Sequence, residues 1–260
     1  MRKFLLISGV ILGLAAMASP IYAQVITENI QLGDGALERN TTGVRNIALG
    51  PDACYENRQG VGNVCIGYAS LYFNTGGSYN VAVGDNALRS NTTGNYNIAY
   101  GVDALRANTT GWFNTAMNYD ALHNNTTGGG NTAEGPLAFY ENTTGNENTG
   151  LGFAAGRNNV TGGKNTCIGY QSCYNMPAAL DNAFAIGYQS VVSESNKGTI
   201  GNAATAEIRL WGAALLTEMP TPAAPGQNQV LFFAQDDGTG KTQFCVRFAT
   251  GEPMCLATQP

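Results

Sequence analysis

The chain has 260 residues, of which 12% are charged, and its net charge is −5. No basic stretch is present that could neutralise phosphates, so the composition argues against a nucleic-acid partner. The 34 glycines do not follow the Gly-x-y period of collagen, and regularly spaced apolar positions argue against a disordered chain.

Residues 1–23 have the features of a secretory signal peptide. Arg2 and Lys3 supply a positive start, an apolar run follows from Phe4 to Met17, and small residues end the segment at Ala23. The run is shorter than the ~20 residues that a spanning helix needs, and no later segment could cross a bilayer as a helix. We therefore expect an exported mature chain, secreted or at the cell surface, without a membrane span.

The body of the chain repeats itself every 17 residues. We assign this repeat to residues 40–213, after an N-terminal cap at residues 24–39. A glycine keeps the same step from Gly43 to Gly162. A fixed short period means that each unit packs only on its neighbours, which is typical of a solenoid. The repeated Asn-x-Ala-x-Gly pattern begins at Asn46, Asn63, Asn80, Asn97, Asn114, Asn131, Asn148 and Asn165.

Two columns of the aligned repeat predict the interior. One column holds only small residues, from Ala48 to Cys167, and a second, six places on, is apolar from Cys54 to Cys173. The glycine column between them takes asparagine once, at Asn118, and both residue types tolerate a left-handed backbone. We expect each coil to contain two short strands and two turns, with the strands of successive coils paired in parallel.

Asparagine also forms a second column, from Asn74 to Asn159. Stacked asparagines can hydrogen-bond along the solenoid axis and satisfy the backbone of the turns, so we expect a structural role for both columns. The alternative is glycosylation, because the second column creates Asn-x-Thr sequons.

An even number of cysteines in an exported chain favours disulfides. Four of the six lie in the two interior columns, and the last two face each other across a predicted hairpin. Buried free thiols are the alternative. The expected pairs are Cys54–Cys65, Cys167–Cys173 and Cys245–Cys255.

A third column, next to the small one, points to the opposite face of the first strand. The column is apolar except for Glu134. An apolar face of this kind must be covered, and we expect another copy of the chain to cover it. Around a symmetry axis the Glu134 carboxylates would converge, unless the coil is locally distorted there. The column comprises Leu49, Ile66, Val83, Tyr100, Met117, Glu134, Leu151 and Ile168.

Four tyrosines recur at one place of the repeat. They are Tyr68, Tyr119, Tyr170 and Tyr188. Exposed aromatic side chains bind partners or sugars, and they also pack between subunits. Both roles remain open from the sequence.

The C-terminal part departs from the repeat. Residues 214–227 form a Pro/Ala-rich linker, and residues 228–260 predict a small three-stranded β-meander. The segment from Gly238 to Thr242 superficially matches a phosphate-binding loop, but it lacks the first glycine and the following helix that such a loop requires.

The repeats Asn63-Val-Cys-Ile-Gly67 and Asn80-Val-Ala-Val-Gly84 resemble the heads of trimeric autotransporter adhesins, the YadA-like left-handed β-roll. Similar repeats occur in phage tail-fibre-like and bacterial surface proteins. The resemblance covers residues 40–201. It implies an all-β fold, a left-handed parallel β-roll solenoid of about ten short coils, assembled as a homotrimeric rod. It also implies a surface ligand, either a glycan or a protein.

Residue types that act in catalysis do not recur at any catalytic spacing in the sequence. The single histidine, His123, has no partners at metal-ligand spacing. We therefore expect no catalytic residue, no metal and no cofactor. The predicted function is an exported, non-enzymatic structural or adhesive protein. The alternatives are a carbohydrate-binding module and, more weakly, an ice-binding solenoid, since the threonines appear in turns.

Overall fold

The computed structural model describes residues 28–204, 230–236, 242–248 and 254–258. The predicted signal peptide and the Pro/Ala-rich linker lie outside these residues. The chain divides into two compact units, Met1–Ala206 and Glu207–Pro260, which are considered separately. The described residues form β-strands and turns, and none of them belongs to a helix.

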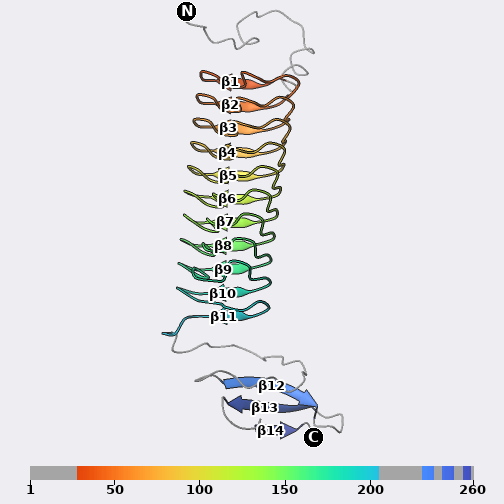
Figure 1. Cartoon of the computed structure of the whole chain (residues 1–260), viewed down its shortest axis with the longest axis vertical. Coiled ribbons are helices and arrows are strands. Elements are labelled where there is room, and N and C mark those ends of the chain that lie inside the picture. The colour runs from red at the N-terminus through yellow and green to blue at the C-terminus, as the bar shows by residue number, and fades with distance from the viewer. Residues whose placement is uncertain (1–27, 205–229, 237–241, 249–253, 259–260) are drawn as a thin grey trace, which may run out of the picture. The chain divides into compact units, whose positions relative to one another are not determined.

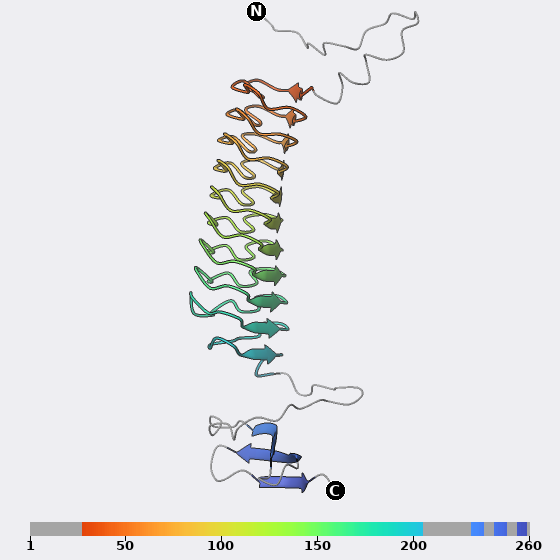
Figure 2. The ribbon, with the colours of Figure 1, turned by 90° about the vertical axis from the view of Figure 1, so that its right-hand side faces the viewer.

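The first unit is a parallel β-solenoid with one strand per coil (Figure 1). Eleven strands of three residues follow one another in both sequence and space. Figure 2 shows the strands stacked along one side and the turn segments along the other. The strands are β1 Ile30–Leu32, β2 Ile47–Leu49, β3 Val64–Ile66, β4 Val81–Val83, β5 Ile98–Tyr100, β6 Thr115–Met117, β7 Thr132–Glu134, β8 Thr149–Leu151, β9 Thr166–Ile168, β10 Phe184–Ile186 and β11 Gly198–Ile200.

The register follows the 17-residue period from β1 to β9. Ile30 pairs with Ile47, so a coil already forms within residues 24–39, the segment that the sequence assigned to a cap. The step then lengthens to 18 residues, as Thr166 pairs with Phe184, and shortens to 14, as Phe184 pairs with Gly198. The shorter last step agrees with the glycine spacing of the sequence, whereas the 18-residue step was not predicted.

The second half of each coil is not a strand, which corrects the prediction of two strands per coil. In the second coil it is a series of turns, and Asp52 and Cys54 have φ values of 56° and 52°. The amide of Ala53 donates to Gly50 in its own coil (3.3 Å). The amide of Cys54 donates to Ser70 in the next coil (2.8 Å). Left-handed residues therefore let this segment hydrogen-bond both within a coil and between coils.

The two predicted interior columns form the core. Every alanine, leucine, cysteine and phenylalanine of these two columns, from Ala48 to Cys173, is fully buried. Phe139 is the largest of them, and it packs against Gly150 and Gly156. A Cβ atom built on Gly150 would lie 2.7 Å from the Phe139 ring. The two glycines thus leave the volume that this ring fills.

Both asparagine columns form buried hydrogen-bonded ladders, as predicted. The amide of Asn80 donates to Asn63 Oδ1 (2.9 Å), and its Nδ2 donates to the carbonyl of Gly94 (2.8 Å). In the second column, Asn91 Nδ2 donates to Asn74 Oδ1 and to the same Gly94 carbonyl, each at 3.0 Å. These side chains are fully buried. A glycan therefore has no access to the Asn91 amide of the folded chain, and the structural interpretation holds.

All three expected disulfides are present. Cys54–Cys65 joins successive coils, and Cys167–Cys173 lies within one coil, with Cα separations of 5.9 and 5.7 Å. Cys245–Cys255 staples the second unit, with a Cα separation of 4.0 Å.

The second unit contains the predicted antiparallel β-meander. Its strands are β12 Val230–Asp236, β13 Thr242–Phe248 and β14 Met254–Thr258, in that spatial order. Cys245 and Cys255 are directly paired across β13 and β14.

Candidate binding surfaces

The outer face of the solenoid sheet presents the predicted interface column. In β2 to β9 the middle residue is buried and its two neighbours point outward, which leaves them half-buried or exposed. Tyr100, for example, is 57% exposed. Glu134 is exposed and pairs in register with Met117 and Leu151, so the coil is not displaced at this point. The column is therefore continuous along the outer face.

A second outward column, which was not predicted from the sequence, lies on the same strands. It is apolar in the first five coils, where Ile30 and Ile98 are 58% and 43% exposed. Together the two columns make the outer face of β1 to β5 apolar throughout. In β6 to β9 the second column changes to threonine, so threonines occur in strands as well as in turns. Its members are Ile30, Ile47, Val64, Val81, Ile98, Thr115, Thr132, Thr149 and Thr166.

The four predicted ligand-contact tyrosines are all exposed. Tyr170 and Tyr188 stack at 5.4 Å between ring centroids, and Phe153 extends this stack at 5.2 Å from Tyr170. Tyr68 and Tyr119 lie in other coils, so the structure does not gather the four into one site. A hydrogen bond with the Asp120 carboxylate raises the pKa of the Tyr119 hydroxyl.

A second aromatic ladder of three rings precedes the strands, in a column that was not predicted from the sequence. Tyr79, Tyr96 and Phe113 stack with centroid distances of 5.2 and 4.9 Å and nearly parallel rings. All three are exposed and have positive φ values between 54° and 58°. Their 17-residue spacing was the signal that could have revealed them. The ladder ends at the next position, because Gly130 has no side chain.

Trp112 marks the end of this ladder. Its indole packs edge-to-face on Phe113 at 5.2 Å, and it is 56% exposed. The indole also lies against Gly129, where an added Cβ atom would come within 3.3 Å of its Nε1 atom. A glycine at this position therefore leaves space for the indole.

An open hollow of 990 Å³ begins at Trp112 and follows the residues that lead into strands β7 to β11. Hydrogen bonds from backbone amides hold two of its polar side chains in place. Asn146 Oδ1 accepts from the amide of Gly129 (2.8 Å), and Asp181 Oδ1 accepts from that of Gly163 (2.7 Å). The lining residues include Trp112, Gly129, Gly130, Asn146, Glu147, Thr161, Gly163, Lys164, Asp181, Asn182 and Asn196.

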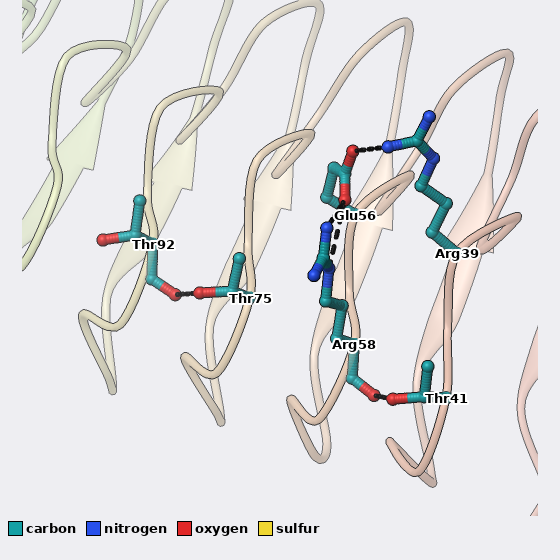
Figure 3. Close-up of polar contacts among 6 residues, drawn as sticks. All are labelled: Arg39, Thr41, Glu56, Arg58, Thr75 and Thr92. Atoms are coloured by element: carbon teal, nitrogen blue, oxygen red, sulfur yellow. Dashed lines mark hydrogen bonds and ion pairs between the residues drawn. The ribbon is translucent and has the colours of Figure 1, made fainter.

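A polar column covers part of the turn side near the N-terminal end (Figure 3). Glu56 forms ion pairs with Arg39 and Arg58, and the Glu56 carboxylate raises the pKa of the Arg39 guanidinium. Thr75 Oγ1 donates to the carbonyl of Thr92 in the next coil (3.1 Å). These contacts connect successive coils, and they are structural in character.

His123 is partly buried instead of being free in solvent. Its Nδ1 lies 2.7 Å from Asp120 Oδ1, and its ring stacks on Tyr140 at 5.1 Å. Within the described part of the chain, no group of three His, Cys, Asp or Glu residues could hold a metal ion. Nor does that part include a helix long and apolar enough to cross a membrane.

Comparisons with known proteins give one structural likeness. No family model matches the chain, and no curated protein matches it. Among solved structures, the chain is similar to the collagen-binding domain of the Yersinia adhesin YadA. The identity is 17%, and the match covers 81% of this chain and 93% of that domain, with a TM-score of 0.33. A likeness at this level carries no conclusion about ligand or assembly.

Proposed function

We propose that the protein is an exported, non-enzymatic surface or fibre protein with an adhesive or structural role, and that its solenoid assembles as a homotrimer. The observation that supports this most directly is the apolar outer face of β1 to β5. A soluble chain rarely leaves such a contiguous apolar face in water, and faces of this kind mark association sites.

An identical copy suits this face better than an unrelated globular partner. The coils from β1 to β9 repeat at the same 17-residue step, so a second copy related by rotation about a parallel axis presents matching columns along this face. A globular partner has no such periodicity. Three copies around one axis would cover the outer face of each.

Export is supported by the disulfides. All six cysteines are paired in the structure, and disulfides persist in oxidising compartments outside the cytosol. A cell-surface or secreted location accounts for both the disulfides and a repeat that presents the same side chains coil after coil.

Light scattering coupled to size exclusion tests the assembly. We expect a trimer for the native chain and dissociation in Tyr100→Asp, because association would bury three unpaired charges together. Phe73→Asp is the matched control. Phe73 is also an exposed aromatic residue, but it lies in the turn segment, so this variant should stay trimeric. A monomeric native chain would overturn the proposed assembly.

A further inference from the structure

The hollow that begins at Trp112 combines an aromatic platform with ordered polar groups. Trp112 supplies an exposed indole, whereas the remaining lining residues are glycines and polar or charged side chains. Asn146 and Asp181 are hydrogen-bonded to backbone amides, and Asn182 Nδ2 donates to Asn196 Oδ1 (2.9 Å). The polar groups are therefore already oriented before any ligand arrives.

We propose that this hollow is a binding site for an uncharged oligosaccharide. The apolar C–H face of a sugar ring packs on an indole, and its hydroxyl groups match the amide and carboxylate side chains, which can accept or donate further hydrogen bonds. An apolar peptide would find only one large apolar side chain here. The polar lining therefore favours a polyhydroxylated ligand.

The shape of the hollow favours a chain of sugars over a single one. Its lining comes from the coils of β6 to β11, one set of side chains per coil. Five coil steps correspond to a length of about 24 Å along the axis. A ligand built from repeating units can thus place one unit after another against successive coils.

The charge of the lining disfavours a polyanionic glycan. Glu147 and Asp181 are acidic, and Lys164 is the single basic residue of the lining in the described chain. A sulfated or sialylated chain would meet more negative than positive charge. An uncharged oligosaccharide has no such penalty.

The proposal rests on the adhesive role proposed above, but the site is formed by one chain. The test titrates the full chain with cellotetraose, chitotetraose, mannotetraose and maltotetraose. Saturation-transfer NMR and tryptophan fluorescence detect the binding. We expect binding of at least one of them. Trp112→Ala should weaken that binding at least tenfold, because it removes the platform.

A second variant fills the hollow instead of removing its platform. Gly130→Tyr continues the ladder of Tyr79 and Tyr96, whose backbones have positive φ as Gly130 does. An added Cβ atom at Gly130 would come no closer than 3.6 Å to Glu147, so the Cβ atom has room, although the positive φ of 69° strains any side chain there. This variant should also lose binding at least tenfold, and its melting temperature is measured alongside to check that the solenoid remains folded. Phe73→Ala, which removes an exposed ring of the turn segment, should bind as the native chain does.

Two outcomes would overturn the site: no binding of any of the four tetrasaccharides at millimolar concentration, or unchanged binding in both hollow variants. Tyr68→Ala tests the predicted ligand-contact tyrosines: loss of binding in this variant, with retention in both hollow variants, would reject the hollow in favour of the column of Tyr68. A trimer without saccharide binding would reject the site and leave the proposed assembly intact. A monomer that binds a saccharide would reject the proposed assembly and leave the site intact.

Discussion

At the scale of single residues, close contact between coils explains both glycine columns, and backbone conformation adds a second reason in one of them. Gly84 has a φ of 131°, Asn118 in the same column has a φ of 93°, and a Cβ atom on Gly84 would also lie 2.6 Å from the Gly101 carbonyl. Gly94 belongs to the other column and has no positive φ. A Cβ atom at Gly94 would overlap the carbonyl oxygen of Gly111 and the side chain of Asn91. This column is glycine because the coils approach each other closely.

Gly94→Ala should therefore destabilise the solenoid. The added methyl group would push the coils apart and disturb both asparagine ladders, with a cost of about 1–3 kcal/mol in the free energy of unfolding. Urea denaturation measures this change. Gly76→Ala is the control, because its Cβ atom would meet nothing closer than 4.0 Å. Equal losses in the two variants would contradict the explanation by coil contact.

At the scale of elements, the sequence predicted one half of each coil correctly and the other half wrongly. Alternating apolar residues correctly identified the strands. The second apolar column suggested another strand around Leu88, but Leu88 has a φ of 51°. Ala87 and Leu88 follow each other and are both fully buried, which the alternating side chains of a strand do not allow. Leucine rarely adopts positive φ, which is why sequence preference pointed to a strand.

The disulfide Cys54–Cys65 occupies positions where other coils carry leucine and alanine. Replacing the pair by Cys54→Leu and Cys65→Ala should therefore retain most of the stability, since it restores the usual interior. The pair Cys54→Ser and Cys65→Ser should lose more, because two hydroxyl groups would be buried. The bond itself contributes less than ~3 kcal/mol for so short a loop. Melting temperatures without reductant compare the variants, and equal values would refute the packing argument.

At the scale of the whole molecule, the sequence predicted a solenoid but not its surfaces. The interior columns were visible because each is chemically uniform from coil to coil. The hollow was not, because its lining changes residue type at every coil and includes the 18-residue and 14-residue steps. The ladder from Tyr79 to Phe113 covers only three coils, so it contributes little to an alignment of eight.

Glu134 is the interface residue that would destabilise the proposed trimer most. It is the only charged residue in the predicted interface column, where three copies would bring three carboxylates together. Glu134→Leu should raise the melting temperature of the trimer, with a larger gain at low ionic strength, where salt screens the repulsion less. Glu38→Leu, an exposed site outside that column, should leave it unchanged. An unchanged melting temperature in Glu134→Leu would indicate that Glu134 faces water.

The coil-to-coil hydrogen bonds also determine how the solenoid responds to mechanical load. They run along the axis, so a force that pulls the two ends apart stretches them one row at a time instead of shearing all rows together. Each coil that peels away releases about 60 Å of extended chain. The Cys54–Cys65 bond keeps residues 55–64, which lie between its cysteines, closed and so limits this extension near the N-terminal end. A tether built in this way yields in small successive steps, which dissipate energy under tension before the whole unit unfolds.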